Sequence, residues 1–217
     1  MKDIQASPEP VNLAFDIGYL FACLPLVVDD GKKPAFSCIM VGDGWMGAAN
    51  GPAALLIEKP IFKGCNYLLN GQDVAKIYDE LLIRQDADAN YRIDEFNLQF
   101  KSDRLAIAVL NGDEKFDIRL EDYPRINLKA RDIEKPTQVT FTAADMPCFD
   151  PYLMGQFTDA LTMFYGGEVN FVRALPTGRL SPMYIELSAD DMHGIFMPTL
   201  SVKDKIANLP PPSAMLQ

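Results

Sequence analysis

The sequence predicts an α+β protein in which a unit of one strand, one helix and three further strands occurs three times. Two observations support this fold class. Apolar residues recur at helical spacing in three places, and each place is followed by short alternating segments separated by Gly, Asn, Asp or Pro turns. The copies share this pattern but almost no sequence identity, so an α+β protein without true repeats stays open as the alternative.

The first unit covers about residues 11 to 60. Residues 11–15 alternate as a strand does. Residues 15–28 carry apolar side chains near helical spacing, but Gly18 and Pro25 interrupt the pattern, so a short, imperfect helix is predicted. Three short strands are predicted next, at 36–41, 45–48 and 53–57, with turns at Gly42-Asp43-Gly44 and Asn50-Gly51-Pro52.

The second unit covers about residues 64 to 128 and contains the clearest helix. After a strand at 65–69, Asn70 is placed to cap a helix. The apolar positions of this helix follow i, i+3, i+4, i+7 and i+8, namely Val74, Ile77, Tyr78, Leu81 and Leu82. Strands are predicted after an acidic loop, at 96–100, 105–109 and 115–120. The first two units together form one predicted domain, residues 11–128.

An extended connector, whose last part is residues 129–136, leads to a third unit predicted at 137–203. Its helix is capped by Asp150, has Pro151 in the first turn and ends before Gly166-Gly167. The apolar stripe of this helix is Leu153, Phe157, Leu161 and Phe164, and strands are predicted at 139–142, 168–174, 183–187 and 194–198. Residues 1–10 are expected to be a separate N-terminal segment and residues 204–217 a flexible tail.

Composition and charge limit the function classes. The chain of 217 residues is 48% hydrophobic and 23% charged, which is typical of a folded globular protein. Its net charge of −10 is expected to repel nucleic acid and anionic membranes unless basic residues gather on one surface. Without a long apolar run or a signal-peptide core, a cytoplasmic protein is expected. The four cysteines are widely spaced and predict reduced, mostly buried thiols, at Cys23, Cys38, Cys65 and Cys148.

The residues that carry chemistry in enzymes form no constellation in this sequence. His193 is the only histidine, in a predicted turn, and no G-x-S-x-G motif accompanies it. Gly42-Asp43-Gly44 matches neither a phosphate loop nor a dinucleotide fingerprint, and the acidic pairs 29–30 and 190–191 are expected to be solvated turn carboxylates. We therefore expect a binding protein, not an enzyme, with no metal ion and no cofactor.

Three motifs near the end of the chain carry a family resemblance. They are F-D-P-Y-L at 149–153, L-S-P-M-Y-I at 180–185 and I-F-M-P-T-L at 195–200. Their order and spacing resemble the end of the bacterial DNA sliding clamps, the DNA polymerase III beta subunits. Residues 11–128 resemble the complete middle domain of that family, and residues 137–202 resemble the second half of its last domain. The resemblance implies a shortened clamp, with antiparallel sheets outside and helices on the face that lines a ring.

The resemblance also implies a groove that binds short peptides of DNA polymerases and other clients. Residues 48–52 fall where the family has T-D-G-H-R-L, and residues 122–126 fall on its G-x-F-P-D-Y-R-R segment. Carried over by position, the groove residues are Gly51, Pro52, Ala53, Ala54, Pro124, Ile126, Ser181, Ile195, Met197 and Pro198. Pro52 and Ala53 stand where the family has His and Arg. The alternative is that these residues simply pack the interface between units.

A ring that slides on DNA needs basic residues on its helices, since contacts with phosphate do not depend on base sequence. Lys76 and Arg84 are the helix residues expected to face DNA, but acidic residues outnumber them on the predicted helices. If a ring holds twelve units, as the resemblance implies, then three per chain give a tetramer with dihedral symmetry.

Three function classes follow from the sequence. The first is a processivity or docking factor for DNA replication, of the kind a phage or mobile element carries. The second is an adaptor or decoy that binds client peptides, or the host clamp, without encircling DNA. The third is an unrelated α+β enzyme, which no residues support.

Overall fold

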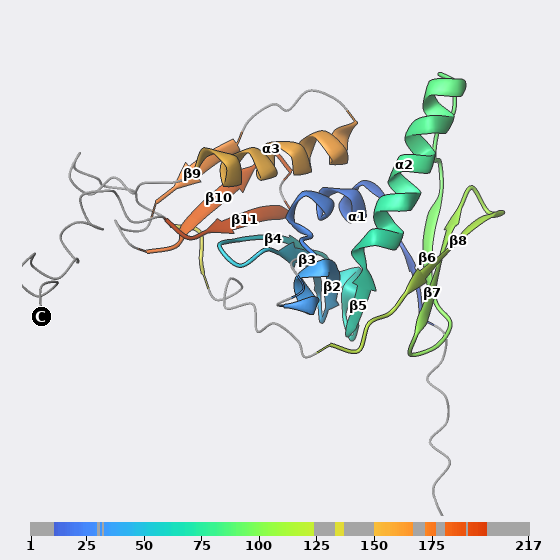
Figure 1. Cartoon of the computed structure of the whole chain (residues 1–217), viewed down its shortest axis with the longest axis horizontal. Helices are drawn as coiled ribbons and strands as arrows, with labels where there is room; N and C mark the ends of the chain where they lie inside the picture. The colour runs from blue at the N-terminus through green and yellow to red at the C-terminus, as the bar shows by residue number, and fades with distance from the viewer. Residues whose placement is uncertain are drawn as a thin grey trace, which may run out of the picture.

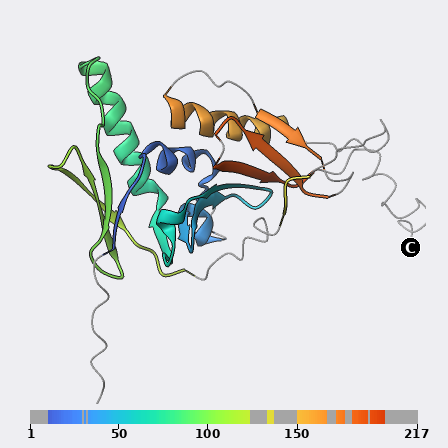
Figure 2. The same cartoon turned by 180° about the vertical axis from the view of Figure 1, so that it is seen from behind.

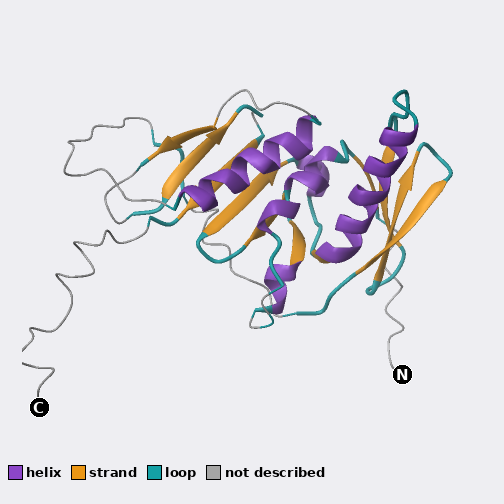
Figure 3. Ribbon diagram, turned by 45° about the horizontal axis from the view of Figure 1, so that its top comes forward, coloured by secondary structure: helices purple, strands orange, loops and turns teal. Residues whose placement is uncertain are grey.

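The computed structural model describes residues 11–29, 31, 33–123, 133–136, 150–166, 172–176, 181–189 and 191–198. This part of the chain forms two antiparallel sheets with the helices packed on one side (Figures 1 and 3). The predicted α+β class with antiparallel sheets and helices on one face is therefore confirmed.

The first unit contains the short helix that its interrupted sequence pattern predicts. Helix α1 (Gly18–Ala22) ends where a 3₁₀ turn, η1 (Leu24–Leu26), places Pro25 in its first turn. A Cβ atom at Gly18 would lie 2.8 Å from the main-chain oxygen of Phe164, so glycine allows α1 a close contact with the helix that contains Phe164. The two interrupting residues thus have separate roles, Pro25 in the turn and Gly18 in the helix contact. The other elements of this unit are β1 (Asn12–Ala14), η2 (Pro34–Ser37), β2 (Cys38–Gly42), β3 (Trp45–Ala49) and β4 (Ala53–Glu58).

The second unit has the predicted capped helix, α2 (Gly71–Ala87). The side chain of Asn70 accepts a hydrogen bond of 3.1 Å from the Asp73 amide, which confirms the cap. Leu82 is 42% exposed although it belongs to the predicted apolar stripe, because α2 rises past the sheets at its C-terminal end (Figure 1). The turn η3 (Pro60–Phe62) leads into this unit, whose other elements are β5 (Tyr67–Asn70), β6 (Phe96–Phe100), β7 (Leu105–Leu110) and β8 (Glu114–Arg119).

The third unit contains the predicted helix α3 (Pro151–Tyr165) and strands β9 (Val172–Leu175), β10 (Met183–Leu187) and β11 (Met192–Phe196). The side chain of Asp150 accepts a hydrogen bond of 2.9 Å from the Tyr152 amide, and Gly166 ends the helix at a φ of 67°. Both predicted helix ends are thus confirmed. The predicted strand at 139–142 and the start of the strand predicted from 168 lie outside the described residues.

Strand pairing links the units to one another. β1 of the first unit joins the sheet of the second, which has the order β1-β6-β7-β8. β5 of the second unit joins a seven-stranded sheet with the order β5-β2-β3-β4-β11-β10-β9. Neither of the first two units therefore completes its sheet with its own strands, and the third unit continues the sheet of the first.

The helices and the sheet faces beneath them share one hydrophobic core, which α1 and α3 cover together (Figure 2). A second, smaller cluster lies on the opposite face of the seven-stranded sheet, which we call the outer face. This outer cluster consists of Phe36, Cys38, Met40, Ala49, Ala54 and Leu68. Both described parts of the connector reach the outer face, since Tyr123 packs on the cluster and Lys135 forms an ion pair with Glu186 of β10.

The cysteine prediction is confirmed for three residues. Cys23, Cys38 and Cys65 are buried free thiols, and burial raises the pKa of Cys38 to about 11. Cys148 lies outside the described residues. In the described part of the chain, no helix has the length and apolar character needed to cross a membrane.

One buried carboxylate joins α2 to the second sheet. Asp73 accepts hydrogen bonds from Nε and Nη2 of Arg119 at 2.7 and 3.0 Å, and a third from the Arg119 amide at 3.1 Å. Burial raises the pKa of Asp73. The hydrogen bonds and the charge of Arg119 lower it by a larger amount, so the pKa of Asp73 is lowered overall.

We expect Asp73→Asn to reduce the free energy of unfolding at pH 7 by about 1 kcal/mol, because it removes a charge-assisted pair. Since the native pKa of Asp73 is lowered, this stabilisation is complete above the pKa of the unfolded chain, about 3.9. It is lost as the pH falls through the lower native value. Urea unfolding of both proteins across this range should show the difference disappearing in acid. Asp79→Asn, an exposed change on the same helix, is the control and should have little effect.

Candidate functional site

The antiparallel pair β4 and β11 brings together residues from distant parts of the chain. Ala54 lies opposite Ile195 and Ala53 lies opposite Phe196. The pairing continues past the end of β11, where the Met197 amide donates a hydrogen bond of 2.7 Å to the Pro52 carbonyl. The structure therefore places the predicted groove residues of the first unit directly beside those of the third.

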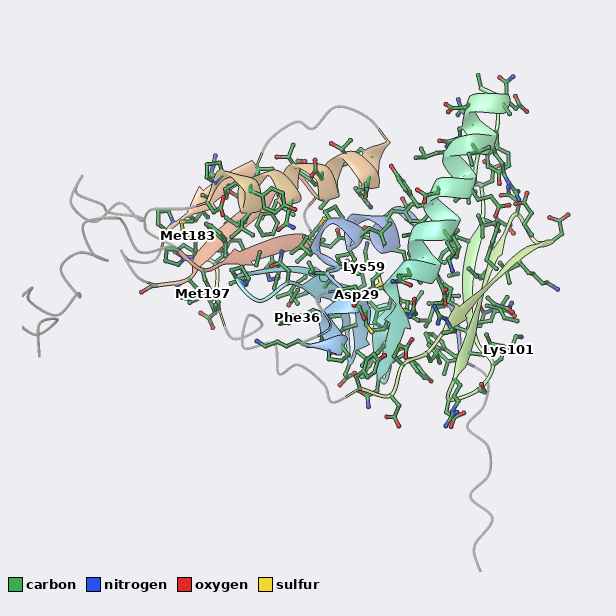
Figure 4. All side chains as sticks on the ribbon, viewed as in Figure 1. Asp29, Phe36, Lys59, Lys101, Met183 and Met197 are labelled. Atoms are coloured by element: carbon green, nitrogen blue, oxygen red, sulfur yellow. The ribbon has the colours of Figure 1, made fainter. Side chains whose placement is uncertain are left out.

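The predicted groove residues differ in exposure. Ala54 belongs to the outer cluster, and Ile195, directly opposite, faces the same side; both are buried. Ala53 faces the helix side and belongs to the main core. Met197, in contrast, is 44% exposed at the end of the strand (Figure 4). The outer face at this point is thus an apolar floor with one exposed thioether beside it.

Ser181 and Pro198 lie at the same end of the sheet. Met183 pairs with Phe196, so continuing this register places Ser181 beside Pro198, and both residues are half-buried. Pro124 and Ile126, predicted to come from the connector, lie outside the described residues.

A buried glutamine on α3 holds the turn that leads into β4. Asn50 accepts a hydrogen bond of 3.0 Å from the Ala53 amide, and its Nδ2 donates to Oε1 of Gln156 at 2.7 Å. Gln156 Nε2 donates in turn to the Pro25 carbonyl at 2.8 Å. Gly51 has a φ of 103°, which favours glycine. Gln156 is not among the residues predicted from the sequence. The signal that could have found it is a polar residue next to Phe157 on the apolar stripe of α3.

A second polar anchor lies at the other end of the β4–β11 pair. The Glu58 amide donates to the Asp191 carbonyl at 2.9 Å, and the Tyr19 hydroxyl donates to Asp191 Oδ2 at 2.7 Å. Lys59 forms an ion pair with Asp191 and lies 4.6 Å from the centre of the Tyr19 ring. Burial raises the pKa of Asp191, but hydrogen bonds from Lys59 and Tyr19 outweigh it and lower the pKa. Asp191 is therefore a structural partner and not the solvated turn carboxylate that the sequence predicts.

His193 lies in β11, not in the predicted turn. Its ring stacks on Tyr184 with a centroid distance of 5.0 Å and an interplanar angle of 10°. Burial lowers the pKa of His193, although the charge of Glu58 opposes this shift. Across the described residues, no group of three or more His, Cys, Asp or Glu side chains is arranged to hold a metal ion.

The residues predicted to face DNA are both on α2 and both have acidic partners. Lys76 Nζ is 3.5 Å from Asp73, with the Lys76 side chain 74% exposed. Arg84 donates to Glu80 at 2.6 Å and forms a second ion pair with Glu114 on β8. The hydrogen bond to Glu80 raises the pKa of Arg84. Arg84 therefore stays charged, and Glu80 and Glu114 balance its charge. The α1 segment has no charged residue, and α3 contributes only Asp159 and its capping Asp150.

Neither a protein-family model nor a curated protein sequence matches this chain. Solved structures do match it. The DNA polymerase III subunit beta from Pseudomonas aeruginosa aligns with a TM-score of 0.59 over 93% of this chain and 69% of that chain, at 10% identity. The sliding clamp from Bacillus subtilis aligns with a TM-score of 0.58 over 93% of this chain and 66% of its own, at 11% identity. The chain has the sliding-clamp fold.

A third match is the sliding clamp from Bartonella birtlesii bound to griselimycin, with a TM-score of 0.60 at 9% identity over 90% of this chain and 67% of that clamp. The chain thus spans about two thirds of the length of these sliding clamps. A shortened version of the sliding-clamp fold is what the terminal motifs predict.

The anchor at Gln156 can be tested by substitution. Gln156→Ala leaves Asn50 Nδ2 and the Pro25 carbonyl without their partner, and each unpaired buried group is costly. We expect a loss of about 2 kcal/mol in the free energy of unfolding, measured by urea denaturation. Thr158→Ala, an exposed change on the same helix, is the matched control. An equal effect of both variants would contradict this role of Gln156.

Proposed function

We propose that this protein is a sliding-clamp-like docking factor that binds peptide segments of replication proteins on the outer face, at the junction of β4 and β11. The observation that supports this best is the hydrogen bond between Met197 and Pro52, which continues the strand pairing beyond the core. It places an exposed Met beside the apolar floor of Ala54 and Ile195, where the resemblance puts the client groove.

The proposed ligand is an extended peptide with apolar anchor residues. A flexible thioether accepts side chains of different shape, and exposed main-chain groups pair with an extended ligand. Pro52 is exposed and carries no charge, so it favours Leu or Phe anchors over acidic ones. Ala53 belongs to the main core on the helix side and does not contact this ligand. The connector residues Pro124 and Ile126 complete the proposed groove.

For the assembly we propose a homo-oligomer, a tetramer in which four chains close a ring around duplex DNA. The sliding-clamp fold and the three units per chain support this number. In this form the protein acts as a processivity factor in the cytoplasm, with Lys76 and Arg84 on the DNA side.

The second candidate function is an adaptor that binds clients, or the host clamp, without encircling DNA. The pairing of Arg84 with Glu80 and Glu114 favours it, because the charge of Arg84 is already balanced within the chain. The net charge of −10 acts in the same direction.

The docking surface is tested with Met197→Ala. Griselimycin, which is bound to the Bartonella birtlesii and Pseudomonas aeruginosa clamps, serves as one probe, and a short peptide with Leu and Phe anchors serves as the other. We expect calorimetry to show about tenfold weaker binding, because a main apolar contact is lost. Adding Pro124→Ala should weaken binding further.

Ile61→Ala, which removes an exposed apolar side chain from η3, is the control and should leave the affinity unchanged. Unchanged affinity in a folded Met197→Ala protein would refute this assignment, as would the failure of the unaltered chain to bind either probe.

Retention on DNA separates the two candidate functions. A closed ring should stay on circular duplex DNA through gel filtration in high salt and be lost once the DNA is cut, because only linear DNA has ends to slide off. Loading by a clamp loader is included in the assay. Loss from both forms, in a protein that still binds peptide, would support the adaptor.

A further inference from the structure

Strand β8 corresponds in its unit to two strands that pair with each other, and within the described residues its outer edge has no strand beside it. The last strands of the first and third units, β4 and β11, lie side by side in the seven-stranded sheet. β8 is the last strand of the second unit, and within the described chain it forms an edge of its four-stranded sheet (Figure 1). The fold therefore offers at β8 the same kind of edge that it uses between β4 and β11.

Among the described residues, no strand pairs with the outer side of β8. The Leu120 amide donates to the Arg104 carbonyl at 2.9 Å. The main-chain amide and carbonyl groups of the even-numbered residues of β8 therefore point toward β7. The amide and carbonyl groups of the odd-numbered residues therefore point in the opposite direction, away from β7, at the outer edge of the sheet. Asp73 already binds the Arg119 amide, and Lys115 and Asp117 supply the edge that remains.

We infer that β8 pairs antiparallel with β8 of a second copy of this chain, about a two-fold axis at Phe116. A two-fold axis perpendicular to the sheet keeps each side chain on its own face. Residues that lie opposite each other must therefore be both even-numbered or both odd-numbered. This condition leaves few registers, and the charges along the strand distinguish them.

With Phe116 opposite its own copy, each Lys115 lies opposite an Asp117. The register shifted by one step places Asp117 against Asp117 and Lys115 against Arg119, which are like charges. The step in the other direction places Lys115 against Lys115. A further register, centred on Ile118, would need Leu120 and Glu121, which already pair with β5. The alternating charges of β8 therefore favour one register of self-pairing and repel its neighbours.

The helix side of β8 fits the same arrangement. Phe116 is half-buried there with Arg84 at 5.7 Å from its ring, and pairing brings the two Phe116 rings together at a non-hydrogen-bonded position. The precedent within the chain is the β4–β11 junction, where Tyr19 of α1 and Phe164 of α3 are in ring contact at 4.7 Å above the strands. α2 has the same place in its unit that α1 has in the first.

This contact supplies one two-fold axis of the proposed ring, and to that extent it rests on the proposed assembly. It does not depend on peptide binding, because Met197 lies just past the end of β11, a strand of the other sheet. A single short strand pair buries little area, so we expect a dissociation constant in the micromolar range.

The test is sedimentation of the full chain up to about 200 µM, well above the affinity expected for a small interface. Lys115→Asp should raise the dissociation constant about tenfold or more, since each substitution acts twice in a symmetric contact. The exchanged pair Lys115→Asp with Asp117→Lys should restore association. Lys101→Asp makes the same charge change at the end of β6 (Figure 4) and should have no effect.

Cross-linking tests the register. At a non-hydrogen-bonded pair the Cα atoms are close enough for a disulfide, so Phe116→Cys should oxidise to a covalent dimer and Asp117→Cys should not. A monomer at every concentration, equal behaviour of the Lys115 and Lys101 variants, or failure of the exchanged pair to restore association would overturn the proposal. Griselimycin affinity separates the two proposals. The Lys115→Asp protein should bind griselimycin as the unaltered protein does. A Met197→Ala protein that loses griselimycin affinity but still self-associates would bear on the groove alone.

Discussion

The pairing of β4 with β11 is the contact on which the rest of this structure depends. It joins the first unit to the third, makes one seven-stranded sheet and sets α3 against α1. Close packing allows little freedom here, because a Cβ atom at Gly194 would lie 2.3 Å from the Phe157 ring. Polar anchors at both ends, Gln156 with Asn50 and Asp191 with Tyr19, fix the register that brings Met197 to Pro52.

Local features of the fold could be predicted because neighbouring residues determine them. Asn70 and Asp150 cap helices through amides two or three residues away, and Gly166 ends α3 with its own backbone conformation. The interrupted pattern around Gly18 and Pro25 also gave the correct position of a short helix. In contrast, the exchange of β1 and β5 between units depends on pairing partners that no local pattern specifies.

The candidate site could be predicted in part. Terminal motifs and turn positions pointed to residues of β4 and β11, and the structure places these side by side. Gln156 was missed because its partners are Asn50 and Pro25, which lie far away in the sequence. The role of Asp191 was missed for the same reason, since a solvated turn carboxylate and a half-buried ion-pair partner have the same sequence signature. Glu114, likewise, shows no sequence relation to Arg84, although it balances the charge of that residue.

The fold separates the proposed docking residues from the residues proposed to face DNA. The proposed docking residues lie on the outer face, whereas α1 and α3 cover the opposite face of the same sheet. Charges on α2 and α3 can therefore change without altering the apolar floor formed by Ala54 and Ile195. Because Arg84 is held between two carboxylates, a phosphate would have to replace ion pairs that already exist within the chain. The proposed peptide binding and the proposed DNA contact therefore depend on different residues, and the outer face and the helix face require separate measurements.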